Sequence, residues 1–118
     1  MRISGQDQME SGIGIDVETD KDPNPKMARF FLKPNEIKKL KPAKWNQNLL
    51  RLWTVKEAIF KSDPLNMNTT LLDYEVSDPN ALCGEAICEK SSFKFYYSTK
   101  KVVKGFLTVA ITKEAFPC

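Results

Sequence analysis

Two prolines, Pro42 and Pro64, enclose the segment that most constrains how this chain folds. Between them, apolar side chains recur every three or four residues, which is the spacing of one face of an α-helix. Proline ends helices because it lacks an amide hydrogen and its ring clashes with the preceding turn. The sequence therefore predicts one long helix from about residue 43 or 44 to about residue 61, with a stop at residues 62–64.

The faces of this helix separate when its residues are placed at intervals of about 100°. Its apolar stripe consists of Trp45, Leu49, Leu52, Ile59 and Phe60, with Trp53 and Val55 at the margins. Lys56 falls within that stripe, where its ammonium group must either reach past apolar neighbours to water or meet an anion, because an unpaired buried charge is costly. Glu57 and Lys61 share the flank, one turn apart. Taken alone they indicate a surface ion pair worth about 0.3–0.5 kcal/mol, and the misplaced Lys56 weakens that interpretation.

Residues 12–18, Gly-Ile-Gly-Ile-Asp-Val-Glu, alternate with the period of two that is typical of a β-strand. We expect a buried strand, whose apolar face carries Ile13, Ile15 and Val17. Asp16 and Glu18 then share the opposite, acidic face. Alternating acidic residues are also common on exposed strands, so this pattern alone is weak evidence for a metal site. Three carboxylates brought together with a lysine would nevertheless suit Mg²⁺ bound to phosphate, since this ion prefers hard oxygen ligands.

The rest of the chain predicts a mixture of short helices and strands. Short helices are expected around residues 26–32 and, after a break at Pro34, from Asn35 to Leu40. Strands are expected at residues 71–76, 93–98 and 105–112, with 81–89 a weaker candidate. A chain of 118 residues is long enough for one core and too short for two. We therefore expect a single domain over residues 1–118, of the α+β class.

The chain contains no histidine. This absence excludes Ser-His-Asp and Cys-His nucleophilic catalysis and removes the commonest transition-metal ligand. Its three cysteines, Cys83, Cys88 and Cys118, are not spaced as Cys-x-x-Cys, so we expect free thiols rather than a disulfide framework or a zinc site. Any chemistry here must rely on carboxylates, lysines and a hard cation.

Charge is distributed unevenly along the sequence. The net charge is −4 over residues 1–25, +8 over residues 26–61 and −1 over residues 62–118, which gives the +3 of the whole chain. The central basic block would attract an acidic protein, nucleotide phosphates or nucleic acid, unless it is simply a solvated face. No segment is apolar enough for a signal peptide or a membrane span, so we expect a cytoplasmic protein without membrane contact.

Three blocks of sequence together resemble the 4′-phosphopantetheinyl transferase superfamily. They are Gly-Ile-Asp-Val-Glu at residues 14–18, Arg-Phe-Phe at residues 29–31, and Trp53-x-x-Lys56-Glu57-Ala58-x-x-Lys61. The family signature pairs Gly-(Ile/Val)-Asp-x-Glu with (Phe/Trp)-(Ser/Cys/Thr)-x-Lys-Glu-(Ala/Ser)-x-x-Lys, and the combination is specific where either half alone is not. The resemblance covers about residues 12–111. It implies an α+β fold in which a small antiparallel sheet packs against a long helix.

The resemblance also implies an activity and a role for each matching residue. Such enzymes move 4′-phosphopantetheine from coenzyme A to a serine of an acyl or peptidyl carrier protein and release adenosine 3′,5′-bisphosphate. By this likeness Asp16, Glu18 and Glu57 bind Mg²⁺, and Glu57 is the catalytic base for the carrier serine. Lys61 would act on the departing oxygen, both Lys56 and Lys61 would bind coenzyme A phosphates, and the basic block would dock the acidic carrier protein.

Two departures from the family pattern predict that the chain self-associates. Larger members join two similar halves, and this chain matches only the second. Larger members also use a histidine upstream of the Asp-x-Glu strand for coenzyme A, which this chain lacks. Shorter members, the holo-acyl-carrier-protein synthases, have about this length and are trimers with sites between subunits. We therefore expect a homo-oligomer, a trimer before a dimer, in which another copy completes the coenzyme A cleft.

Two alternatives remain open at this point. The chain could be a non-catalytic accessory domain that binds carrier proteins and retains the motif. It could also be a basic nucleic-acid-binding module, although it has no recognised motif of that kind and its aromatic residues lie mostly in predicted core strands. We favour the active transferase and expect no nucleic-acid partner.

Overall fold

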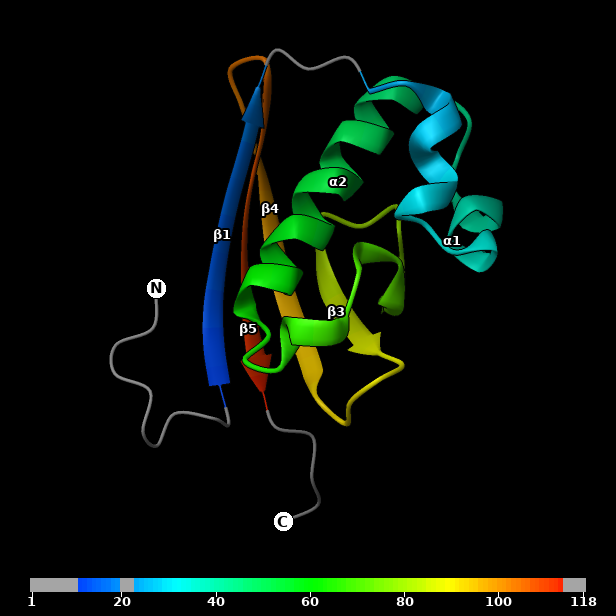
Figure 1. Ribbon diagram of the computed structural model, residues 1–118. Coiled ribbons are helices and arrows are strands. Elements are labelled where there is room, and N and C mark those ends of the chain that lie inside the picture. Colours follow the sequence, from blue (N-terminus) through cyan, green and yellow to red (C-terminus); the bar gives the residue numbers. More distant parts are fainter. Residues whose placement is uncertain (1–10, 20–22, 114–118) are drawn as a thin grey trace.

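The computed structural model describes residues 11–19 and 23–113, in which one strand is followed by all of the helices and then by four further strands (Figure 1). The strands are β1 (Ser11–Thr19), β2 (Tyr74–Val76), β3 (Cys83–Cys88), β4 (Lys94–Val102) and β5 (Gly105–Lys113). The α-helices are α1 (Pro34–Lys39) and α2 (Trp45–Ser62), and the 3₁₀ helices are η1 (Pro25–Phe30), η2 (Asn66–Asn68) and η3 (Leu71–Asp73).

The strands form one antiparallel sheet in the order β1-β5-β4-β3-β2. Helix α2 lies along one face of this sheet, and the shorter helices pack beyond it on the same side (Figure 1). The predicted α+β architecture, a small antiparallel sheet packed against a long helix, is confirmed. None of the helices in the described ranges is both long and apolar enough to cross a membrane.

Helix α2 separates two hydrophobic clusters, which explains its broad apolar stripe. Towards the sheet, Val55 and Ile59 pack in a cluster with aromatic residues of β2 and β4. On its other side, Leu49 and Leu52 pack in a second cluster with side chains of η1 and α1. The helix ends at Ser62, whose hydroxyl donates to the Ile59 carbonyl at 2.7 Å, and Pro64 follows as expected.

The prediction that the apolar face of the first strand faces the core was wrong. Ile13, Ile15 and Val17 are 54–56% exposed, on the face of the sheet opposite α2. The glycine face packs on the helix instead. The two backbones lie so close that a Cβ at Gly12 would be 2.2 Å from the Ser62 carbonyl oxygen. Only residues without a side chain allow so close an approach of strand and helix backbones. The same packing turns Asp16 inwards, where it is buried.

Two smaller expectations also needed correction. The second short helix begins at Pro34 rather than at Asn35, and Lys33 is its N-cap, because proline is well suited to the first helical position. The strand predicted at residues 71–76 is limited to Tyr74–Val76. Its first half is the 3₁₀ helix η3, in which the Asp73 carboxylate accepts a hydrogen bond from the Thr70 amide at 2.8 Å.

Candidate functional site

The close packing of β1 on α2 brings a carboxylate next to a lysine. A Cβ at Gly14 would lie 2.1 Å from the Ala58 carbonyl oxygen, so the strand rests directly on the backbone of the helix. Lys61, one turn beyond Ala58, donates from Nζ to Asp16 Oδ1 at 2.9 Å and to the Ile15 carbonyl at 3.4 Å. Asp16 and Lys61, which are 45 positions apart in the sequence, therefore meet in one site.

The electrostatics of this site indicate an excess of negative charge. Burial raises the pKa of Asp16, and the nearby Glu18 raises it further, although the hydrogen bond and charge of Lys61 oppose the shift. Burial also raises the pKa of Glu57, and the charges of Asp16 and Glu18 add to this effect against Lys61. The pKa of Lys61 is itself raised, chiefly by its hydrogen bond to Asp16. Glu18 thus makes ionisation of Asp16 harder, and both make ionisation of Glu57 harder, which favours a bound cation.

One oxygen of Asp16 has no hydrogen-bond partner among the residues that the structure describes. Within the described ranges, Asp16 Oδ2 is buried and no donor reaches it, whereas Oδ1 is held by Lys61. A buried carboxylate oxygen without a partner costs free energy, and native proteins leave few such atoms. A ligand that approached from the side of Glu18 and Glu57 would relieve this cost.

The ligand atoms and charges of these carboxylates suit a magnesium ion, whereas their positions do not yet form a metal site. As they lie, no three Asp, Glu or Cys side chains in the described part of the chain form a group ready to hold a metal ion. The donors are hard oxygens, their charges interact, and Asp16 Oδ2 is available, which are the properties that Mg²⁺ requires. The electrostatics of the site nevertheless favour a cation, because carboxylate side chains can turn once a cation is present. Binding of Mg²⁺ by Asp16, Glu18 and Glu57 stays a prediction.

Lys56 lies in different surroundings from those expected for a phosphate ligand. Its side chain is fully buried, and its ammonium group donates to Glu36 Oε1 at 2.9 Å and to the Tyr74 carbonyl. Glu36, in α1, is also almost completely buried. The anion that Lys56 meets is therefore an internal carboxylate, and this geometry directs Lys56 away from the Asp16 site. The sequence had no signal for Glu36, since one glutamate among lysines resembles an exposed residue.

Comparison with known protein families decides how this site is understood. A family model described as the 4′-phosphopantetheinyl transferase superfamily matches residues 12–111. That match includes nearly all of β1, all of α2 and most of β5. The chain belongs to the 4′-phosphopantetheinyl transferase superfamily. A comparison with curated proteins gives no match.

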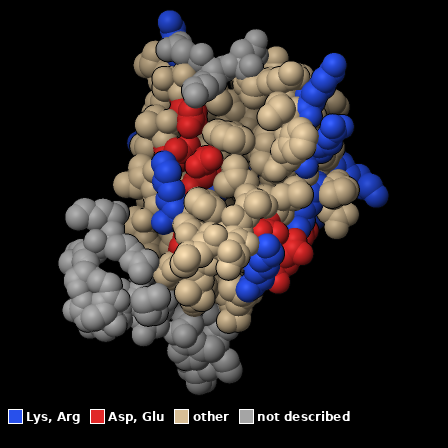
Figure 2. Space-filling model, in the orientation of Figure 1, with Lys and Arg blue, Asp and Glu red and all other residues tan. Residues whose placement is uncertain are grey.

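Membership of the phosphopantetheinyl transferase superfamily confirms the resemblance drawn from the sequence. Phosphopantetheinyl transfer is the activity of this family, and its members use coenzyme A and typically Mg²⁺. The structure brings together residues of the two sequence motifs that carry the resemblance. Asp16 comes from the motif in β1, and Glu57 and Lys61 come from the motif in α2. Acidic side chains gather next to a basic one over β1 and α2 (Figure 2).

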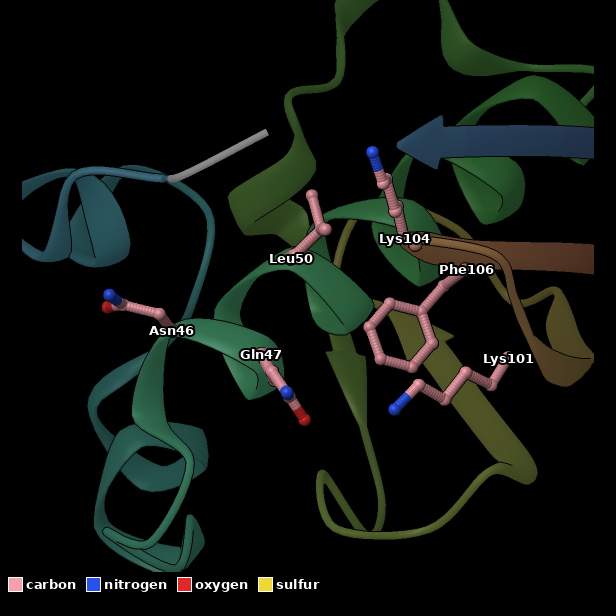
Figure 3. A pocket seen from close by; sticks show the side chains of 7 residues that line it. Asn46, Gln47, Leu50, Lys101, Lys104 and Phe106 are labelled. Carbon is pink, nitrogen blue, oxygen red and sulfur yellow. The ribbon is translucent and has the colours of Figure 1, made fainter. Parts of the chain in front are cut away.

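A basic cavity lies at the other end of α2 from Lys61, and sequence reasoning missed it. It has a volume of about 370 Å³ and lies between the start of α2 and the hairpin that joins β4 to β5 (Figure 3). Its lining consists of Asn46, Gln47, Leu50, Lys101, Lys104, Gly105 and Phe106. Phe106 is the cross-strand partner of Glu18, so in this phosphopantetheinyl transferase fold the cavity lies next to the Glu18 end of β1. Lys101 and Lys104 gave no signal because they lie outside the central basic block.

Proposed function

We propose that this chain transfers 4′-phosphopantetheine from coenzyme A to a serine of an acyl or peptidyl carrier protein, with the help of Mg²⁺. The observation that carries the proposal is Asp16 Oδ2, which has no hydrogen-bond partner among the described residues and lies beside Lys61, in a site where burial raises the pKa of Asp16 and of Glu57. Phosphoryl transfer depends mainly on positioning and on neutralising charge at the phosphate, and this site offers both.

Asp16, Glu18 and Glu57 would hold the cation. When bound, Mg²⁺ would neutralise charge on the pyrophosphate of coenzyme A and align it with the attacking oxygen. Glu57, which lies beside the carboxylates of β1, would take the proton from the carrier serine, either directly or through a water molecule.

The transfer exchanges one phosphorus–oxygen bond for another. The serine oxygen attacks the phosphorus that carries pantetheine, and the bond from that phosphorus to the bridging oxygen of adenosine 3′,5′-bisphosphate breaks. Lys61 is about half exposed, so its ammonium group can leave Asp16 and turn to the departing oxygen. There it stabilises the new negative charge or supplies a proton.

The basic cavity is suited to the nucleotide part of coenzyme A. Lys101 and Lys104 provide positive charge, and Asn46 and Gln47 belong to the first turn of an 18-residue helix, whose amides attract anions. We assign the nucleotide phosphates to this cavity. The assignment predicts that Lys101→Met weakens coenzyme A binding more than Lys94→Met does, measured by isothermal titration.

The carrier protein would dock on the basic surface of the short helices. The side chains of Lys26, Arg29, Lys38, Lys39 and Lys41 are exposed there. Figure 2 shows basic side chains along this edge of the molecule, away from the acidic cluster over β1 and α2. An acidic partner would be attracted to this edge.

A second copy of the chain would cover the outer face of the sheet. Ile13, Ile15 and Val17 of β1 continue into Val109 and Ile111 of β5, and all five are exposed by 39% or more. A contiguous apolar face of this kind marks an interaction site. We propose a homo-oligomer, a trimer before a dimer, which light scattering would show. Fully active protein with a strictly monomeric mass would contradict it.

The transfer is tested by incubating the protein with coenzyme A, Mg²⁺ and a panel of apo carrier proteins, with mass spectrometry to detect the added group. We expect modification by the wild type and none by Glu57→Ala. A Glu57→Ala variant that modifies carriers at a rate near that of wild type would refute the role of this carboxylate. Glu85→Ala, which removes an exposed glutamate of β3, is the matched control and should remain active.

The accessory-domain alternative makes a different prediction. Such a domain would bind carrier proteins without using coenzyme A. Isothermal titration of the wild type with coenzyme A, with and without Mg²⁺, separates the two functions. Metal-dependent binding supports the transferase, and its absence together with carrier binding supports the accessory domain.

A further inference from the structure

A single buried carboxylate joins three elements of the fold on the side of α2 away from β1. Glu36, in α1, is 1% exposed. Its Oε1 accepts hydrogen bonds from Lys56 Nζ at 2.9 Å and from the Lys33 amide at 2.7 Å, and its Oε2 accepts from the Val76 amide at 2.6 Å. Lys56 completes the network by donating to the Tyr74 carbonyl. The network therefore links α1, α2 and β2.

Stability alone does not account for this ion pair. Removing two charges from water costs several kcal/mol per ion, and apolar residues of similar volume often replace buried pairs without loss of stability. The cost is visible at Lys56, where burial lowers the pKa against the opposing effect of Glu36. What the pair adds is direction. Apolar contacts are non-directional, so a helix resting on them alone can turn slightly about its axis at little cost. A turn that separated Lys56 from Glu36 would leave an uncompensated buried charge.

The rotation of α2 matters because the proposed catalytic residues lie on the same part of the helix. Glu57 follows Lys56 directly, and Lys61 lies one turn beyond Glu57. Successive residues point about 100° apart, so fixing the direction of Lys56 towards Glu36 also fixes the direction of its neighbour. We propose that Glu36 is a positioning residue, which holds Lys56 and thereby keeps Glu57 pointed at the carboxylates of β1. This inference rests on the proposed function for its activity readout only.

The test replaces both charges at once. The double variant Lys56→Met/Glu36→Gln keeps side chains of similar length, leaves no buried charge, and retains an oxygen for the Val76 amide. We expect it to fold and its kcat for carrier modification to fall by up to about 10²-fold, the effect of misplacing a catalytic group by about 1 Å. The KM for the carrier protein should change much less, because the exposed lysines of α1 are unaltered.

Arg51 provides a matched control on the same helix. It is another buried cation, 4% exposed, and it donates to the Pro79 carbonyl at 2.6 Å and the Ala81 carbonyl at 3.2 Å. Arg51→Met removes a buried charge but leaves the contact between α1 and α2 intact. We expect it to lower stability and to leave kcat near the wild-type value.

A structural readout separates this inference from the proposed function. The amide signals of Gly14 and Asp16 report how β1 sits on α2, because these residues contact the helix at Ala58 and Lys61. In ¹H–¹⁵N spectra we expect both signals to shift in the double variant and not in Arg51→Met. A wild type without transferase activity would refute the proposed function, and the amide signals would still decide the positioning role. A folded double variant with unshifted signals and wild-type kcat would overturn it.

Discussion

Helix α2 carries two lysines that each bond a carboxylate at 2.9 Å, on opposite sides of the helix. On the α1 side, Lys56 and Glu36 are both buried, and both oxygens of Glu36 accept hydrogen bonds. On the β1 side, the Lys61 side chain is 48% exposed and Asp16 keeps one oxygen without a partner in the described part of the chain. The two pairs have the same chemistry and the same length. They differ in the carboxylate oxygens that have no hydrogen-bond partner. We call Lys56 and Glu36 the closed pair, which supports the fold, and Lys61 and Asp16 the open pair, which can bind a ligand.

The largest expected effect comes from breaking the closed pair. Glu36→Ala leaves Lys56 charged and buried, together with a Val76 amide that has lost its acceptor. We expect the free energy of unfolding to fall by about 3–5 kcal/mol, measured by urea denaturation. The control is Glu85→Ala, which removes a carboxylate that is 49% exposed and 3.9 Å from Lys94. That change should cost less than about 1 kcal/mol. Equal losses for the two variants would contradict the distinction.

A smaller loss of stability is expected from moving β1, which carries Asp16, away from α2, which carries Lys61. In Gly14→Ala, the new methyl group would lie 2.1 Å from the Ala58 carbonyl oxygen, so β1 must move away from α2. We expect a loss of about 1–3 kcal/mol in the free energy of unfolding, with lower carrier modification. Gly84→Ala is the matched control, because the nearest atom to its methyl group would be the Tyr97 hydroxyl at 3.4 Å. Equal stability and activity of the two alanine variants would show that the close packing of β1 on α2 is not needed for the site.

Neutralising the open pair should stabilise the fold slightly. Asp16→Asn removes a charge whose ionisation is opposed by burial and by Glu18. We expect the free energy of unfolding at pH 7 to rise by about 0.5–1 kcal/mol while Mg²⁺-dependent transfer is lost, the usual exchange of stability for function at an active site. Thermal denaturation and the carrier mass-shift assay measure the two effects. A destabilised Asp16→Asn variant would show that the open pair also serves the fold.

The smallest expected effect is the pH dependence of the difference in free energy of unfolding between Asp16→Asn and the wild type. Because the folded pKa of Asp16 is raised, the folded protein binds more protons than the unfolded chain, and the wild type loses stability as pH rises through the folded pKa. The advantage of Asp16→Asn should therefore be absent below about pH 4 and grow towards neutrality.

Asp73 provides a comparison with the opposite sign. Its pKa is lowered, because hydrogen bonds from the Thr70 amide and from Lys90 outweigh burial. Asp73→Asn should be less stable than wild type at neutral pH, and this deficit should vanish as pH falls through the folded pKa of Asp73. Urea denaturation of both variants at several pH values measures the two trends. Differences that move in the same direction for the two variants would contradict the assigned pKa shifts.

Elements with a strong local signal were predictable from the sequence. Helix α2 lies within a residue or two of its predicted ends, because Pro42 and Pro64 act locally. The strands β4 and β5 also formed where branched and aromatic residues predicted them. The juxtaposition of Asp16 with Lys61 was predictable only through the family motif, because no local rule places β1 against that turn of α2.

The features that the sequence did not reveal depend on partners distant in the chain. Period two divides β1 into two faces without saying which one is buried, and the choice is made by the glycines against α2. The partner of Lys56 is twenty residues away in a segment that reads as solvated. The basic cavity combines the start of α2 with the β4–β5 hairpin, so no single stretch of sequence contains it.

The sheet order has a consequence for when activity can arise during synthesis. All nine register pairs of β1 are with β5, the last described strand. Strand β1 therefore cannot join the sheet until β5 has been synthesised. Contacts between such distant positions form slowly, and ribosomes add residues at only about 5–20 per second. Helix α2 can emerge and fold first, carrying its glutamate and lysine without an opposing strand. The proposed site would therefore remain incomplete in a growing chain until β5 has joined the sheet.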